Sequence, residues 1–172
     1  MFVLRWLDNN AEKTIILISY VVMAGIIFVE VIRRFVFNEQ APWSSTIPVY
    51  LFLWVVWAGC AQNVKLRTHL RFEEFRSRFG YTGQFACLML DAVLWIVFSL
   101  IVIYYTAEQV QLSRQNFAIV PGTNDTMQWW FYLATPVCFS LLIIRVLQNV
   151  WRDIACYRQR QPFNLPSNIM AD

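Results

Sequence analysis

The sequence predicts an all-α integral membrane protein with four transmembrane helices, both termini in the cytoplasm, and an amphipathic basic segment between the second and third helices. Apolar residues make up 58% of the 172 residues and charged residues 15%, and the mean hydropathy is +0.45. Soluble domains contain about 25% charged residues, and a soluble chain of this size could not bury so many apolar side chains. The composition therefore excludes a disordered chain, a nucleic-acid-binding domain and an ordinary soluble enzyme.

Four long stretches that are poor in charge set the expected organisation. We treat residues 1–172 as a single membrane domain, because four such stretches follow one another with short polar connections. A helix needs about 20 apolar residues to cross a bilayer. The expected spans are residues 14–37, 45–64, 83–107 and 127–150, and a polar, partly flexible tail follows at 151–172.

The first two spans are bounded by charges and by a turn. The apolar run of the first span is too long for the core of a cleavable signal peptide, so we expect an uncleaved helix. Residues 38–42 have the composition of a turn. No charged residue occurs from Gln40 to Val64, and Pro48 lies where proline is tolerated, in the first turn of a helix.

The last two spans are separated by a polar connection that contains the turn signal Pro121-Gly122. Asp91 is the one charge within the third span. Trp129, Trp130 and Tyr132 begin the fourth span and are typical of an aromatic belt at a membrane interface.

The segment 65–78, between the second and third spans, is rich in arginine and also contains apolar residues. Leu66 and Leu70, like Phe75 and Phe79, are four residues apart, which is the spacing of one helix face. The segment is either an amphipathic helix in the membrane interface or a solvated basic loop.

Lysine and arginine residues predict the orientation, because they are more frequent in cytoplasmic flanks. With four spans, the two termini and the connection 65–82 share one side, which carries most of these residues. They are Arg5, Lys13, Lys65, Arg67, Arg71, Arg76, Arg78, Arg152, Arg158 and Arg160, against Arg33, Arg34 and Arg114 on the other side. Both termini are therefore expected in the cytoplasm.

Ionisable residues within the spans require a structural or functional reason, because they are costly in lipid. Glu30 precedes Arg33 and Arg34 by three and four residues, so we expect local charge pairing near the interface. The alternative is a proton-binding carboxylate. Asp91 and Arg145 reach similar depths on antiparallel helices, which predicts an ion pair within the chain or a contact of one of them with a partner protein.

Cysteine and histidine usage gives no sign of a metal site or cofactor. Cys60, Cys87 and Cys138 lie in apolar segments and Cys156 lies in the basic tail, without CxxC spacing, so we interpret them as small hydrophobic residues. His69 is the one histidine. We expect no cofactor and no enzymatic activity.

Several motifs in this order resemble the small membrane subunit of tripartite ATP-independent periplasmic (TRAP) transporters, the DctQ-like family. They are Arg34-Phe35-Val36-Phe37-Asn38, Pro42-Trp43-Ser44, Leu51-Phe52-Leu53-Trp54, Gly59, Lys65-Leu66-Arg67-Thr68-His69-Leu70, and Trp129, Tyr132 and Pro136. The sequence departs from the family pattern at Ser45-Thr46, where the family has two acidic residues, at Val49, where a basic residue is common, and at Cys138, where glycine is usual.

The resemblance implies a role without a substrate site of its own. In this family a large multi-span subunit carries the substrate and sodium sites, and a periplasmic protein captures an organic acid such as a C4-dicarboxylate or sialic acid. The small subunit is thought to brace the scaffold of the large one. The alternative that we keep is a small proton-coupled multidrug exporter that works as a dimer, with Glu30 as its essential carboxylate.

Seven residues are candidates for contact with the partner or with lipid. Trp43 and Trp54 are candidate anchors, although Trp43 could equally be an ordinary belt residue. Gly59 and Ala61 allow close approach of a second helix, either from the partner or from within the chain. Arg67, His69 and Arg71 are candidates for binding lipid headgroups or a loop of the partner, although His69 could simply be solvated.

Overall fold

The structure is a computed structural model that describes residues 2–67, 79–123, 125–161 and 163, with residues 2–9 described as backbone only. Its helices, in chain order, are α1 (Phe2–Ile32), the π-helical η1 (Arg33–Phe37), α2 (Ile47–Leu66), α4 (Tyr81–Gln115), the short α5 (Trp129–Tyr132) and α6 (Ala134–Arg158). Within the described residues, four helical segments are long and apolar enough to cross a membrane. This finding confirms the predicted all-helical class. The orientation of the termini stays a prediction.

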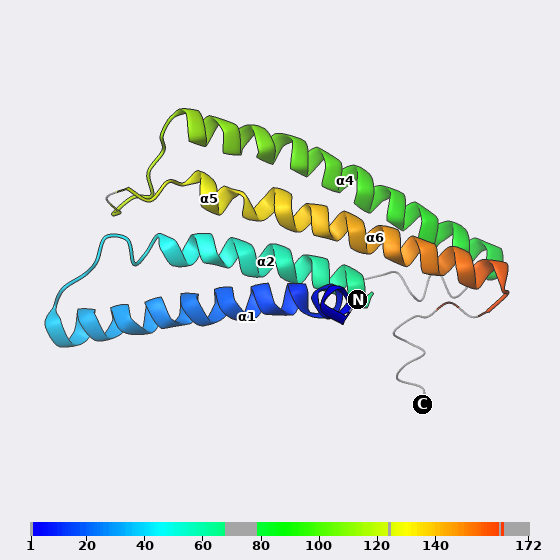
Figure 1. Cartoon of the computed structure of the whole chain (residues 1–172), viewed down its shortest axis with the longest axis horizontal. Coiled ribbons are helices and arrows are strands. Elements are labelled where there is room, and N and C mark those ends of the chain that lie inside the picture. Colours follow the sequence, from blue (N-terminus) through cyan, green and yellow to red (C-terminus); the bar gives the residue numbers. More distant parts are fainter. Residues whose placement is uncertain (1, 68–78, 124, 162, 164–172) are drawn as a thin grey trace.

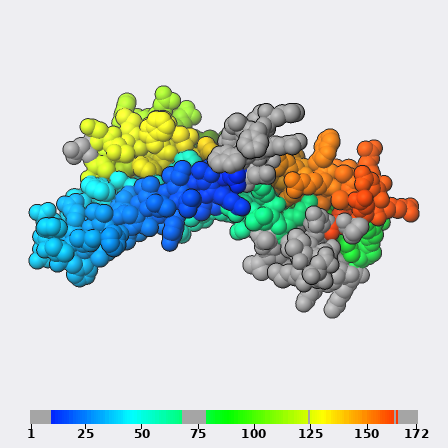
Figure 2. Space-filling view, turned by 60° about the horizontal axis from the view of Figure 1, so that its bottom comes forward, coloured from blue at the N-terminus to red at the C-terminus, as the bar shows by residue number. Residues whose placement is uncertain are grey.

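The helices lie side by side in a single layer. Figure 1 shows the order α1, α2, α6, α4, and the backbone contacts agree: α1 touches α2, α2 touches α6, and α6 touches α4. Helix α6 therefore has a neighbour on both sides. The layer is also staggered, because α1 and η1 extend past the other helices at one end while α4 and α6 extend past them at the other. Figure 2 shows the same offset, with α1 in blue and the end of α6 in orange on opposite halves of the view.

The helices extend beyond the apolar stretches that predicted them. Helix α1 begins at Phe2, α4 continues to Gln115, and α6 continues to Arg158, into the expected tail. Residues 107–115 and 151–158 contain good helix formers such as Ala, Glu, Gln and Arg and no proline or glycine, so the backbone hydrogen bonding continues. The 35 residues of α4 span about 50 Å, which exceeds the ~30 Å hydrocarbon core of a bilayer.

The apolar core is small and is centred on α6. Its buried members are Ala61, Val64, Ala92, Phe139, Leu142 and Val146. The three from α6 are spaced as one helix face, and the alanines of α2 and α4 allow those helices to approach it closely. The outer faces remain covered with large apolar side chains; Phe28 is 65% exposed and Tyr104 69%. Exposed apolar area of this extent is typical of surfaces that contact lipid or another protein.

The connections 38–46 and 116–128 pack against each other at the end of the layer that lies away from the N-terminus (Figure 1). Gly122 has a φ of +85°, and a Cβ atom there would lie 2.4 Å from the carbonyl carbon of Pro42 and 2.6 Å from the nitrogen of Trp43. Only glycine fits this backbone and this space. The adjoining hydrogen bond from the Gln128 amide to the Tyr50 hydroxyl, 2.6 Å long, joins the second connection to α2.

We expect Gly122→Ala to destabilise the chain by about 1–3 kcal/mol, because the alanine would be strained and would collide with the backbone at Pro42. Gly25→Ala is the matched control: Gly25 lies in α1, and nothing lies within 4 Å of its added Cβ. That change should leave stability unchanged or raise it by up to about 1 kcal/mol. Thermal unfolding of the two variants in detergent makes the comparison, and equal melting temperatures would contradict the proposed packing.

Candidate functional site

The most extensive set of buried polar contacts lies near the end of the layer where the N-terminus is found. We call it the polar junction, and it consists of Glu12 from α1, Lys65 and Arg67 from the end of α2, and Arg145, Asn149 and Asp153 from α6. Its charged members connect α1, α2 and α6.

Glu12 is the centre of the first half of the polar junction. The residue is only 1% exposed. One carboxylate oxygen accepts a hydrogen bond from Nε of Arg145, and the other lies 3.5 Å from Nζ of Lys65. Arg145 also donates to the side-chain oxygen of Gln148, at 2.8 Å. A single carboxylate thus joins α1 to both α2 and α6.

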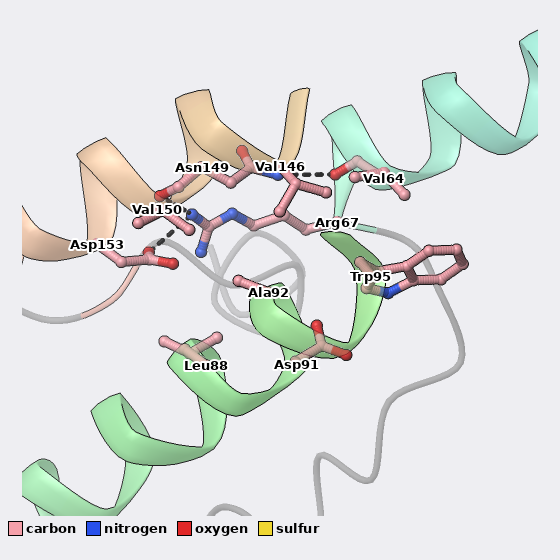
Figure 3. A pocket seen from close by; sticks show the side chains of 10 residues that line it. All are labelled: Val64, Arg67, Leu88, Asp91, Ala92, Trp95, Val146, Asn149, Val150 and Asp153. Atoms are coloured by element: carbon pink, nitrogen blue, oxygen red, sulfur yellow. Dashed lines mark hydrogen bonds and ion pairs between the residues drawn. The ribbon is translucent and has the colours of Figure 1, made fainter. Parts of the chain in front are cut away.

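Arg67 forms the second half, and its backbone conformation directs it inward. It follows the last residue of α2 in a left-handed conformation, with φ +58°, and its backbone N–H donates to the carbonyls of Asn63 and Val64 at the helix end. Its Nη2 donates to Oδ1 of Asp153 at 2.7 Å and to the carbonyl of Asn149 at 3.1 Å (Figure 3). In return, the Asn149 amide donates to the carbonyl of Val64 at 2.9 Å. The end of α2 is therefore held to α6 by bonds in both directions.

The polar junction fixes how far the helices can slide along one another. Apolar faces in lipid tolerate small shifts, whereas buried charges are tolerated only when each one meets its partner. A shift of α1 or α6 by one residue, about 1.5 Å along the axis, would stretch or break these contacts. The polar junction therefore has a structural role, since its side chains bond to one another.

Of the two arrangements predicted for Asp91 and Arg145, the ion pair within the chain is wrong, because Arg145 on α6 pairs with Glu12 on α1. A contact of Asp91 with a partner protein stays a prediction. The depth argument compared only the third and fourth spans and placed residues 1–13 ahead of the first span. Because α1 begins at Phe2, Glu12 lies within the helix, beside α2 and within reach of α6. Asp91 instead lines a small cavity next to Arg67 (Figure 3).

The charges at the far end of α1 also differ from the expected local pairing. The Glu30 carboxylate accepts a hydrogen bond from the backbone N–H of Ala41 at 3.1 Å, and so connects α1 to the turn that follows it. Arg33 lies 3.6 Å from Glu39, and Arg34 is exposed. The π-helical geometry of η1 begins at Arg33 and changes the spacing of side chains that an α-helix would bring together.

The candidate contact residues fall into three groups. Ala61 is fully buried in the core and Arg67 is 7% exposed, so both are used within the chain rather than on its surface. Trp43, Trp54 and Gly59 are partly exposed, and a Cβ at Gly59 would meet open space. His69 and Arg71, with most of the basic segment, lie outside the described residues.

Other features agree with a membrane protein held together without covalent links. All four cysteines have free thiols. Trp129 and Trp130 stack with their ring centres 4.3 Å apart, and the Arg114 guanidinium lies 5.9 Å from the ring centre of Trp129. Aromatic pairs beside an arginine are common at the ends of membrane spans.

These features define a multi-pass membrane protein whose buried charges connect its own helices. The sequence model of the family described as "Tripartite ATP-independent periplasmic transporters, DctQ component" matches residues 23–156. This match includes most of the chain, and the protein therefore belongs to the DctQ family, the small permease component of TRAP transporters. It is a transporter component and not an enzyme.

Three characterised relatives are similar at low identity. The C4-dicarboxylate TRAP transporter small permease protein of Vibrio cholerae is 22% identical, over 85% of this chain and 72% of the relative. The sialic acid TRAP transporter small permease protein of the same organism is also 22% identical, over 86% of this chain and 84% of the relative. The isethionate TRAP transporter permease protein DctMQ of Oleidesulfovibrio alaskensis is 22% identical over 86% of this chain, which spans only 24% of that longer protein.

We expect Glu12→Gln to destabilise the chain by about 3–5 kcal/mol, because it would replace the carboxylate that meets the buried guanidinium of Arg145 by a neutral amide. Glu39→Gln is the matched control, since it removes a carboxylate whose side chain is 72% exposed and should change stability little. Chemical unfolding of the purified chain in detergent measures both.

The double variant Glu12→Gln/Arg145→Gln separates pairing from simple loss of side chains. It should be less destabilised than the sum of the two single variants, because neither unmatched charge of that pair remains. Additive losses would show that the two residues stabilise the protein independently.

Proposed function

We propose that this protein is the accessory small subunit of a sodium-coupled TRAP transporter that imports an organic acid of the C4-dicarboxylate or sialic acid type. In this proposal it lies in the bacterial inner membrane with both termini in the cytoplasm. It braces the scaffold of the large membrane subunit and binds no substrate itself. A periplasmic substrate-binding protein takes part through the complex. The observation that supports this most is the family match over residues 23–156.

The single-layer architecture supports a bracing role. A layer one helix thick exposes apolar side chains on both faces, so one face can meet a protein scaffold while the other meets lipid. The buried charges Glu12, Arg67 and Arg145 hold the layer in register from within. A rigid layer of this kind can support a neighbouring protein. Its buried charges already bond to one another within the layer.

The position of the positive charges supports the proposed orientation. Lys13, Lys65 and Arg67 lie at the same end of the layer as the N-terminus. Arg158 ends α6 at that side, and Arg160 follows it two residues later. Cytoplasmic flanks of membrane proteins carry such an excess of lysine and arginine.

A larger partner is supported by the relative of which this chain spans 24%. That relative is a TRAP transporter permease protein in which a unit similar to this chain forms part of a much longer polypeptide. The same kind of association is proposed between this unit and a large membrane subunit. Trp43, Trp54 and Gly59 are our candidates for the contact, because each remains partly exposed.

The exporter alternative has less support, because Glu30 is bonded to the backbone N–H of Ala41. That contact gives its carboxylate a structural position at the end of α1.

The experiment is reconstitution after gentle extraction. The tagged chain should co-purify with a much larger multi-span membrane protein at equal stoichiometry. Liposomes that hold both proteins and receive the cognate binding protein should accumulate labelled C4-dicarboxylate or sialic acid when a sodium gradient is applied. Liposomes that hold this chain alone should accumulate neither, and uptake by the chain alone would overturn the proposal.

Gly59→Leu tests one candidate contact. Nothing in the rest of the chain lies within 4 Å of a Cβ added at Gly59, so the variant should keep the melting temperature of the unsubstituted chain. It should recover less of the large subunit, since the larger side chain prevents close helix approach. Ala61→Leu is the contrasting variant, because Ala61 is fully buried and its enlargement should lower the melting temperature of the chain itself. Full recovery of the large subunit with Gly59→Leu would exclude this position from the interface.

A further inference from the structure

A small cavity lies where α2, α4 and α6 come together, beside the polar junction (Figure 3). It offers about 20 Å³ of space for the centre of a water molecule. Its polar lining comes from Arg67, Asp91, Asn149 and Asp153, and Ala92 forms part of its wall. A site of about 10–15 Å³ by this measure is enough for one water, provided that two or more polar groups face it.

One nitrogen of Arg67 lacks an acceptor at this cavity. Nη2 is engaged with Asp153 and Asn149, whereas Nη1 is buried and meets no hydrogen-bond partner within the part of the chain that the structure describes. The arginine side chain is only 8% exposed. In Figure 3, Nη1 of Arg67 points away from Asp153 and Asn149, toward Ala92 on α4. Guanidinium groups stay charged and are costly to bury with an N–H unsatisfied.

We propose that the cavity binds a single ordered water molecule, which accepts a hydrogen bond from Nη1 of Arg67 and donates to the carboxylate of Asp153. Asp91 contributes to the lining on the α4 side. The volume of the cavity suits a molecule of about the size of water. A cation would be repelled by the adjacent guanidinium and an anion by the two carboxylates, so a small neutral molecule that both donates and accepts fits best.

The proposed water lies between the polar junction and α4. Arg67 belongs to the end of α2 and Asp153 to α6, while Asp91 and Ala92 belong to α4. Helices α2 and α4 lie on opposite sides of α6 in the layer (Figure 1). A water between Arg67 and Ala92 therefore fills the space where the end of α2 faces α4.

Substitutions at Ala92 test the site in the full chain, purified in detergent with the proteins that remain bound to it. Ala92→Val would fill the cavity with methyl groups and displace the water without replacing its hydrogen bonds. Ala92→Ser would place a hydroxyl there. We expect Ala92→Val to melt about 3 °C or more below Ala92→Ser, because the valine leaves the guanidinium N–H unsatisfied.

The same pair of variants in an Arg67→Met background is the control for packing. Without the guanidinium there is no buried N–H for the serine hydroxyl to satisfy. The difference in melting temperature between Ala92→Ser and Ala92→Val should therefore vanish or reverse. An equal difference in both backgrounds would show that only packing matters and would overturn the proposal.

Density maps of the unsubstituted protein give an independent measurement that does not depend on how the variants fold. At a resolution that shows ordered waters, we expect an isolated peak about 3 Å from Nη1 of Arg67. An empty cavity at that resolution, or density continuous with a polypeptide side chain, would overturn the proposal.

Discussion

The ion pair between Glu12 and Arg145 is the interaction on which the arrangement of the helices depends most. A single layer of helices buries little apolar surface, because each helix touches its neighbours along narrow stripes. Lipid tails are as apolar as leucine side chains, so apolar contacts alone do not specify which helices pair or at what depth. Buried charges do specify this, because a charge in a low-dielectric environment requires its own partner. One carboxylate from α1 thereby determines the register of α2 and α6 as well.

The two ends of the layer are held by different chemistry. Near the N-terminus, Arg67 and Asp153 add a second ion pair to the one at Glu12, so the end of α2 is connected to α6 through side chains. At the opposite end the connections pack backbone against backbone, where Gly122 meets Pro42. Helix α6 lies between these regions with a neighbour on both sides. The middle of the layer can therefore be made of small and apolar residues without loss of a defined structure.

Hydropathy predicted the existence of the spans, because lipid requires long apolar segments wherever they occur in the chain. It could not predict the order α1, α2, α6, α4, since any antiparallel arrangement satisfies the same requirement. Glu12 was missed because its partner lies 133 residues away and nothing in the local sequence indicates such a pairing. Arg67 was expected on the surface, and only its left-handed backbone turns it inward. The π-helical turn at Arg33 likewise has no clear signal in the sequence, which is why the contact of Glu30 with Ala41 was not foreseen.

The long separation between Glu12 and Arg145 has a consequence for how the protein is made. Chains emerge from the ribosome and enter the membrane with the N-terminus first, at about 5–20 residues per second. Glu12 is therefore synthesised well before the arginine that neutralises it, and α1 and α2 must wait for the last helix to arrive. Until then the carboxylate has only Lys65 as a countercharge within the junction. The junction closes only after Arg145 has been synthesised, so it distinguishes a chain that contains α6 from one truncated before that helix.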